Sequence, residues 1–509
     1  MTDEIFIIAA YGMIILLTVL ALVTLMVVGW VLVAYIIDVR QTRHTVRRNF
    51  PVIGRFRYFF EHLGEFFRQY FFAMDREEMP FNRAERTWVY RAAKKLNTTI
   101  AFGSTRRLDV PGTVIFVNSP FPALKQDFAE TQPLVIGEHC RTPYHATSLI
   151  NISGMSYGAL SKPAVQALSR GARKAGCWMN TGEGGLSPYH LEGGCDIVFQ
   201  IGTAKYGVRN EFGELDDAKL HAIAAHEQVK MIEIKLSQGA KPGKGGILPA
   251  EKVTAEIAAI RHIPVGEASI SPNGHPEIRS VEDLLDMVGH IRAVTGKPVG
   301  FKTVLGDVNW IRDLCRAVQL RGAESAPDFI TLDGAEGGTG AAPQSLMDYM
   351  GLPLTQALPM LVDVLDEFNL RPRVRVICSG KLITPDRVAW ALCVGADFVV
   401  SARGFMFALG CIQSFQCNKN TCPTGITTHN PRLQRGLVPE DKAERVAHFV
   451  ETIMQEVGII AHSCGVDEPR KLTRHHARMV QPNGEARLLS ELYGSDQFHP
   501  GTELAFNDD

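Results

Sequence analysis

Eight short runs rich in β-branched and apolar residues recur from about residue 145, and they constrain the fold more than any other feature of the chain. They are SLINIS, CWMNTG, DIVFQI, MIEIKL, PVGFKTV, FITLDG, VRVICSG and DFVVSA. Helix-like stretches such as PAVQALSRGARKAG and TPDRVAWALCVGA separate several of them. This alternation predicts an α/β fold, a closed (β/α)8 TIM barrel whose active site lies where the strands end. A doubly wound open sheet is the alternative, but no GxGxxG turn follows the first run.

A second constraint is the N-terminal segment Ile5–Ile37, 33 residues without a charge. About 20 residues cross a bilayer, so one long or tilted transmembrane helix fits this length and two do not. A cleaved signal peptide is the alternative, but the run is too long and lacks a basic start and a small-residue cleavage site. Arg40, Arg43, Arg47 and Arg48 follow the run. This positive-inside bias predicts a single-pass protein of the cell membrane with a cytoplasmic catalytic domain.

These patterns divide the chain into four predicted parts. They are a transmembrane anchor over 1–40, a helical linker region over 41–130, the barrel over 131–440 and a helical tail over 441–509. Within the linker, phenylalanines recur at spacings of one, three and four among arginines and glutamates, in NFPVIGRFRYFFEHLGEFFRQYFF. Such a segment either lies on the membrane surface or packs its aromatic face on the main domain, and both interpretations stay open.

Composition excludes some classes of partner. The 53 lysines and arginines nearly balance the 54 aspartates and glutamates, and no aromatic and basic stripe is present, so nucleic acid is not an expected partner. Ten cysteines in 509 residues do not form a disulfide framework, and several lie inside apolar runs. We therefore expect a reducing compartment, in agreement with the predicted topology.

Chemistry-bearing residues collect at the predicted strand ends. After MIEIKL the chain reads SQGAKPGKGGILP, which brings Lys235, Gln238, Lys241 and Lys244 into one glycine-rich loop. Small residues in GMSYG and EGG, after the first two runs, let a flat ligand approach the backbone closely. Lys302 lies inside the apolar run PVGFKTV, where an unpaired ammonium is costly, so a partner is expected.

The last three runs favour a flavin site. Asp333 ends FITLDG, and a glycine-rich turn follows it. In barrels of this class the loops after the seventh and eighth strands often bind a phosphate, and here they contain Gly380, Lys381, Ala402 and Arg403. Together with a lysine buried on the fifth strand, this pattern indicates flavin mononucleotide (FMN), with Lys302 offsetting negative charge on the reduced ring.

Three cysteines follow the last strand, in GCIQSFQCNKNTCPTGITTH. Cys411, Cys417 and Cys422, with proline after the third, suit an iron–sulfur cluster with three protein ligands. A structural zinc site that adds His429 is the alternative, although such sites usually have closer cysteines. Three unconnected buried thiols are the third interpretation.

Together these motifs resemble a known family. ISGMSYGALSKPA, MNTGEGG, QIGTAKYGV, KLSQGAKPGKGGILPAEKV, SVEDL, LDGAEGGTGAAP and ALGCIQSFQCNKNTCPTGITTHNPRL are similar to the flavin-binding synthase domain of glutamate synthases, over residues 130 to 440. The resemblance implies FMN beside a [3Fe-4S] cluster, with a hydride passed to the imine of 2-oxoglutarate and ammonia to give glutamate.

The resemblance also implies roles for individual residues. Cys411, Cys417 and Cys422 become cluster ligands. Lys235, Gln238, Lys241 and Arg261 become candidates for binding the oxo acid, and Glu183 for orienting ammonia or donating a proton. The expected FMN-binding residues are Ser153, Gly154, Met155, Gln200, Lys302, Asp333, Gly337, Gly338, Gly380, Lys381, Ala402 and Arg403.

The chain departs from the family pattern in three ways. Lys244 and Ile247 stand where the family usually has an acidic residue and a glutamine. This difference predicts a change in the substrate, or in the way the substrate binds. No glutaminase or nicotinamide domain is recognised, so free ammonia and a separate electron-donor protein such as ferredoxin are expected. Two other functions stay open: an FMN oxidoreductase of another amino or hydroxy acid coupled to a membrane electron carrier, and a non-catalytic electron relay.

Overall fold

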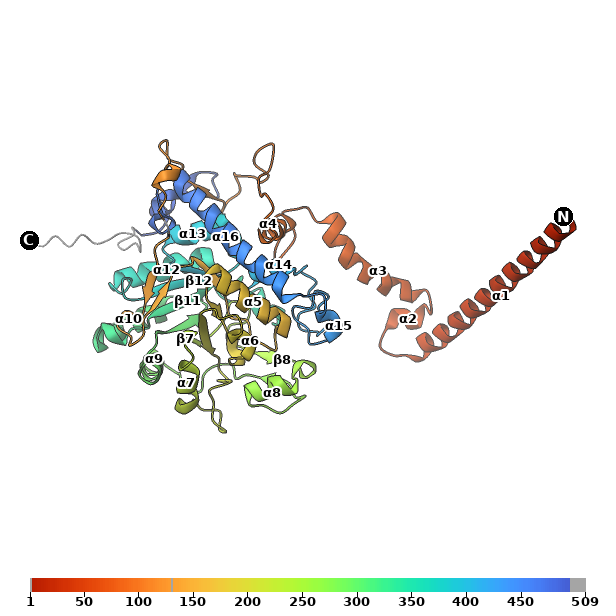
Figure 1. The fold of residues 1–509 in the computed structure, drawn as a ribbon, viewed down its shortest axis with the longest axis horizontal. Helices are drawn as coiled ribbons and strands as arrows, with labels where there is room; N and C mark the ends of the chain where they lie inside the picture. Colours follow the sequence, from red (N-terminus) through yellow and green to blue (C-terminus); the bar gives the residue numbers. More distant parts are fainter. Residues whose placement is uncertain (1, 130, 495–509) are drawn as a thin grey trace, which may run out of the picture. The chain divides into compact units, whose positions relative to one another are not determined.

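A closed barrel of parallel strands forms the main body of the computed structural model, which describes residues 2–129 and 131–494 (Figure 1). The order around the barrel is β10-β11-β12-β13-β4-β5-β6-β7. The strands are β4 (Ile150–Ile152), β5 (Met179–Asn180), β6 (Ile197–Ile201), β7 (Val229–Lys235), β10 (Val299–Thr303), β11 (Phe329–Asp333), β12 (Arg375–Ser379) and β13 (Phe398–Ser401). Seven of them lie within the predicted runs, and β7 overlaps MIEIKL but begins two residues earlier, at Val229. The predicted (β/α)8 barrel is confirmed.

Helices cover the outside of the barrel, and this explains why its strands are buried on both faces. Every residue of β6, β10, β11, β12 and β13 is buried. The principal outer helices are α5 (Lys162–Ala175), α7 (Asp217–Ala224), α9 (Val281–Thr295), α10 (Asn309–Arg321), α12 (Leu354–Glu367) and α13 (Pro385–Val394). Shorter elements of the loops are α6 (Pro188–Leu191), β8 (Ile247–Leu248), α8 (Ala255–Arg261), β9 (Ser269–Ile270) and α14 (Arg403–Leu409).

A hairpin closes the amino-terminal end of the barrel. Its strands, β2 (Leu134–Ile136) and β3 (Tyr144–Ala146), are antiparallel. Tyr144 packs in one buried cluster with Trp178 at the start of β5 and Phe329 at the start of β11. Because apolar side chains fill this end, the carboxyl ends of the strands form the mouth that is left for chemistry.

The C-terminal region is helical only in its first part. Helix α16 (Pro439–Ser463) packs along α5 (Figure 1). After it, β14 (Ala477–Val480) and β15 (Ala486–Leu488) form a hairpin that pairs with β1 (Val114–Phe116). The structure thus differs from the helical tail and helical linker of the sequence prediction. The overlooked signal is the turn at Asn483-Gly484, where Gly484 has φ +84°. Residues 495–509 lie outside the described part.

The N-terminal unit, residues 1–84, is separate from the unit that holds the barrel. It contains α1 (Thr2–Arg40), α2 (Thr45–Asn49), α3 (Gly54–Phe67) and the π-helical turn η1 (Arg68–Phe72) (Figure 1). The segment Asp3–Arg40 of α1 is long and apolar enough to cross a membrane, and its most apolar stretch is exposed. The predicted long N-terminal helix is therefore present.

Candidate active site

Two buried charges pair across neighbouring strands at the mouth of the barrel. The Nζ atom of Lys302, on β10, lies 3.5 Å from Oδ2 of Asp333, on β11. The same Oδ2 accepts the backbone N–H of Gly239 at 2.9 Å, and Oδ1 accepts the hydroxyl of Ser379. Asp333 is thus the partner that an ammonium in an apolar strand requires. Two of the predicted FMN-binding residues therefore form one charged pair.

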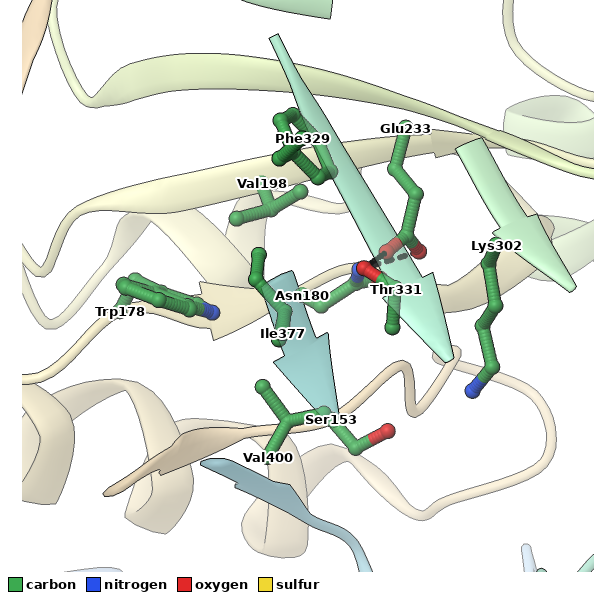
Figure 2. Close-up of a pocket in the computed structure, with 10 residues that line it drawn as sticks. All are labelled: Ser153, Trp178, Asn180, Val198, Glu233, Lys302, Phe329, Thr331, Ile377 and Val400. Atoms are coloured by element: carbon green, nitrogen blue, oxygen red, sulfur yellow. Dashed lines mark hydrogen bonds between the residues drawn. The ribbon is translucent and has the colours of Figure 1, made fainter. Parts of the chain in front are cut away.

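A second buried acid lies deeper in the barrel, and the sequence analysis missed it. Glu233 on β7 accepts hydrogen bonds from Asn180 at 2.8 Å, Gln200 at 2.6 Å and Thr331 at 2.6 Å (Figure 2). Gln200, predicted to bind FMN, therefore has its amide engaged inside the barrel. The signal for Glu233 was available, because a carboxylate in the apolar run MIEIKL needs partners as much as Lys302 does.

A small cavity lies between these groups. Its lining includes Ser153, Asn180, Glu233, Lys302 and Thr331 (Figure 2). In Figure 2 Asn180 and Thr331 point toward Glu233, whereas the ammonium of Lys302 and the hydroxyl of Ser153 lie nearer the arrowheads of the strands. Two polar layers result: the hydrogen-bonded network around Glu233 inside the barrel, and the Lys302–Asp333 pair with Ser153 at its mouth.

A glutamate and two lysines form a charged cluster beside this mouth. Lys235 Nζ lies 3.3 Å from Oε2 of Glu183 and also donates to the side-chain oxygen of Gln238. Lys241 is buried and donates to the carbonyl of Gly245 at 3.3 Å. Burial raises the pKa of Glu183, but Lys235 and Lys241 outweigh it and hold that pKa below its usual value. Burial lowers the pKa of Lys241. These four predicted residues are brought together.

Arg261 stands behind this cluster. Its guanidinium is buried and donates to the hydroxyls of Ser269 at 3.2 Å and Ser156 at 3.4 Å, and to the carbonyl of Tyr157 at 3.4 Å. Its charge contributes to the lowered pKa of Glu183. In this arrangement Arg261 holds the loop that follows β4, so its direct contact with an oxo acid stays a prediction.

The glycine turn after β11 lies against two charged side chains. A Cβ atom on Gly338 would come within 1.9 Å of Arg403 Nη2, and one on Gly337 within 2.7 Å of Asp333 Oδ1. A larger residue at either position would therefore displace the Arg403 or the Asp333 side chain. Burial lowers the pKa of Arg403, whereas the charges of Cys417, Cys411 and Asp333 raise it. The guanidinium of Arg403 thus links the glycine turn to the cysteine loop.

The other predicted FMN-binding residues lie in three loops at the strand ends. Ser153, Gly154 and Met155 follow β4, and Met155 accepts a hydrogen bond from His190 at 3.3 Å. A Cβ atom on Gly154 would lie 3.0 Å from the Asn180 side-chain oxygen. Gly380 and Lys381 follow β12, and Ala402 follows β13. Burial lowers the pKa of Lys381. Whether these residues bind a phosphate stays a prediction.

The three cysteines of the loop after α14 lie beside a buried cation. Burial raises the pKa of Cys411 to about 12. Lys252, nearly fully buried, donates to the carbonyls of Ala159 at 3.3 Å, Cys417 at 2.9 Å and Thr427. Burial lowers the pKa of Lys252 to about 8, against the charges of Cys417 and Cys422, which raise it. The sequence analysis did not single out this lysine.

The structure does not assemble these thiols into a metal site. Within residues 2–129 and 131–494, no three His, Cys, Asp or Glu side chains are grouped so that they could hold a metal ion. Nε2 of His429 lies 2.8 Å from the carbonyl of Gly158, so this nitrogen is engaged away from the cysteines. Both the iron–sulfur and the zinc interpretations therefore stay predictions.

Comparison with known proteins identifies the family. Residues 113–467 match the model described as the conserved region in glutamate synthase. The glutamate synthase large subunit-like protein YerD of Bacillus subtilis is 39% identical over 497 residues, 90% of this chain and 94% of that protein. The chain belongs to the glutamate synthase family. An archaeal glutamate synthase [NADPH] of Methanocaldococcus jannaschii is 36% identical over 332 residues, 65% of this chain and 61% of that protein.

Solved structures align with the chain at much lower sequence identity. A flavocytochrome b2 is 13% identical with a TM-score of 0.46, over 84% of this chain and 88% of that one. A mandelate oxidase is 15% identical with a TM-score of 0.42, over 78% and 90%.

Proposed function

We propose that this family member is an FMN-dependent oxidoreductase that forms glutamate from 2-oxoglutarate and ammonia, with electrons from a separate donor protein such as ferredoxin. The observation that carries the proposal is the cluster of Glu183, Lys235 and Lys241 at the mouth of a glutamate synthase barrel. Two carboxylates of the substrate add two negative charges to that of Glu183. Lys235, Lys241 and Arg261 supply three positive charges, so the occupied site is balanced.

Each residue of the cluster has a distinct task in this reaction. Lys235 and Lys241 bind the carboxylates of the oxo acid, and Gln238 orients Lys235 through its side-chain oxygen. Glu183, whose pKa is held below its usual value, stays ionised near neutral pH. It therefore accepts N–H hydrogen bonds and orients ammonia rather than donating a proton. Arg261 fixes the loop over the pocket and adds positive charge.

The residues at the barrel mouth fit a flavin with a phosphate. The Lys302–Asp333 pair offers a cation beside the ring, the turn with Gly337 and Gly338 allows close approach, and Lys381 and Arg403 offer charges for the phosphate. Ser153, Gly154, Met155, Gly380 and Ala402 complete the proposed site, and Gln200 supports it from inside the barrel. When bound there, FMN supplies hydride transfer.

A [3Fe-4S] cluster on Cys411, Cys417 and Cys422 fits the chemistry of its surroundings. Three thiolates carry negative charge, and the buried cations Lys252 and Arg403 both interact electrostatically with them. Such a cluster supplies one-electron transfer between a donor protein and the flavin site. In this proposal helix α1 anchors the protein in the cell membrane by a single span, and the barrel lies in the cytoplasm; the length of the apolar helix and the arginines after it support this.

The proposal is tested by following the flavin spectrum of the purified chain without oxygen. We expect bound FMN that dithionite reduces and that 2-oxoglutarate with ammonia reoxidises. Lys241→Met removes one charge-assisted contact worth roughly 1.5–3 kcal/mol, so the concentration of 2-oxoglutarate needed rises about ten- to a hundredfold. Lys174→Met, at an exposed ion pair with Glu444 on the barrel exterior, is the matched control and should not change it.

Two results with the unmutated protein would contradict the proposed reaction. If its reduced flavin ignores 2-oxoglutarate with ammonia but reacts with another amino or hydroxy acid or its oxo form, the substrate is different and Lys244 and Ile247 mark the change. If no small acid exchanges electrons with it, the protein is an electron relay.

A further inference from the structure

An exposed aromatic face runs along α3. Phe56, Phe60, Leu63 and Phe67 recur at intervals of four and three residues, which puts them on one side of the helix. The exposed fractions of Phe56, Phe59 and Phe60 are 57%, 58% and 61%, and Phe71 and Phe72 of η1 reach 74% and 73%. Glu61 and Glu65 lie on the opposite side. We call Phe56, Phe59, Phe60, Leu63 and Phe67 the aromatic face.

An ion pair between a buried aspartate and a half-buried arginine joins the start of α3 to the end of α1. Asp38, 1% exposed, accepts two hydrogen bonds from Arg55, at 2.8 and 2.9 Å, and one from the backbone of Val52 at 3.0 Å. Asp38 is the first charge after the apolar run that ends at Ile37. The start of α3 is therefore held beside the end of the apolar run of α1, the part of that helix that could lie in the hydrocarbon core of a membrane.

Helix α2 covers a different side of α3. The guanidinium of Arg47 lies 4.6 Å from the ring centre of Tyr58, and the rings of His44 and Tyr58 are 5.0 Å apart. A Cβ atom on Gly54 would come within 2.8 Å of the Val46 carbonyl, so the two helices are in close contact. Tyr58 is about 160° from the centre of the aromatic face on a helical wheel. The contact with α2 therefore leaves that face open.

We propose that α3 lies on the cytoplasmic surface of the membrane that α1 crosses, with its aromatic face in the boundary between headgroups and acyl chains. This inference rests on the proposed anchoring by α1. Lipid is the occupant that the arrangement favours, because the Asp38–Arg55 pair holds the helix where a bilayer surface would lie. Arg57, on the flank of α3, and Arg40, Arg43 and Arg48, which follow the apolar run, suit anionic headgroups.

The test places a photo-crosslinking p-benzoylphenylalanine at one position of the intact chain in nanodiscs of phosphatidylethanolamine and phosphatidylglycerol. Position Phe60 samples the aromatic face, and Glu65, with a side chain 64% exposed, samples the opposite face. Leu20, in the middle of α1, tests whether α1 lies in the membrane, independently of where α3 lies. After illumination, mass spectrometry identifies what is attached. We expect lipid adducts at Leu20 and at Phe60, with about tenfold less at Glu65.

The other outcomes overturn the inference in different ways. Lipid adducts at Leu20 but not at Phe60 would leave the anchor standing and remove α3 from the membrane surface. A crosslink from Phe60 to a second chain, or to a peptide of the barrel, would identify a protein surface as the occupant. No lipid adduct at Leu20 would overturn the anchoring, and the surface helix with it.

Discussion

Lys252 donates hydrogen bonds from one buried ammonium to the carbonyls of Ala159, Cys417 and Thr427. These carbonyls belong to the loop after β4 and to two points of the cysteine loop. A single side chain thus joins the proposed substrate side of the mouth to the proposed cluster side. The proposed reaction needs these two sides at a fixed separation, because electron transfer and hydride transfer would meet at the proposed flavin site.

We predict that Lys252→Met loosens the cysteine loop. The change keeps the length of the side chain but leaves three carbonyls without their donor, which costs about 2–4 kcal/mol. The apparent melting temperature should fall, and maleimide should label Cys417 and Cys422 faster in iron-free protein, as measured by peptide mass spectrometry. Lys174→Met serves as the control. Unchanged labelling and melting would show that Lys252 does not hold the loop.

At the scale of elements, α5 and α16 pack more closely than two helices with ordinary side chains would. A Cβ atom on Gly171, in α5, would lie 2.5 Å from Cβ of Val446 and 2.8 Å from the carbonyl of Ala443, both in α16. Glycine at this position therefore sets the distance between the helices. The contact joins the C-terminal helix to the outer layer of the barrel.

Gly171→Ala should consequently destabilise the protein, although alanine is the better helix former. Overpacking should lower the free energy of unfolding by about 1–3 kcal/mol, and the higher helix propensity of alanine offsets up to about 1 kcal/mol of this loss. Gly458→Ala is the matched control, because in α16 its Cβ would meet nothing nearer than 3.7 Å, and it should be neutral or slightly stabilising. The melting temperatures of the two variants, measured by thermal unfolding, test this prediction. Equal melting temperatures would show that the helices can separate at little cost.

At the scale of the whole molecule, buried histidines make stability depend on pH. His190 is fully buried between the Ser187 hydroxyl and the Met155 carbonyl, and burial lowers its pKa to about 4. Burial also lowers the pKa of His275. The unfolded chain takes up protons on these groups near pH 6.5, whereas the folded chain does not.

The protein should therefore lose stability as the pH falls below about 6.5. The protonation of His190 alone should lower the free energy of unfolding by about 3 kcal/mol by pH 4. Above about pH 6.5 this stability is fully retained, because His190 is then neutral in both the folded and the unfolded chain. Melting temperatures of the intact chain between pH 7.5 and 5 measure the loss, and His190→Asn should make the slope shallower. A slope that is the same in this variant would mean that other groups cause the loss.

Part of the site was predictable because burial of a charge demands a partner. This argument pointed to Lys302 and applies equally to Glu233, which was missed although it lies in the apolar run MIEIKL. It does not apply to Lys252, which follows Glu251 in the polar stretch AEKVT, so its burial could not be read from the sequence. It could not name the partners. Asp333 meets Lys302 only because β10 and β11 are neighbours in register, and Gln200 meets Glu233 only because β6 lies beside β7.

The sequence by itself determined the eight strands, the long apolar helix and the residues at the strand ends, because periodicity and solvation act over a few neighbouring residues. The tertiary structure alone decided the register in which β13 pairs with β4, with Val399 opposite Ile150. It also decided that β14 and β15 join β1, and that Arg261 and Lys252 support loops from behind. These outcomes depend on contacts between residues far apart in the chain. Local patterns do not encode such contacts, because their free energy arises only when the whole barrel packs.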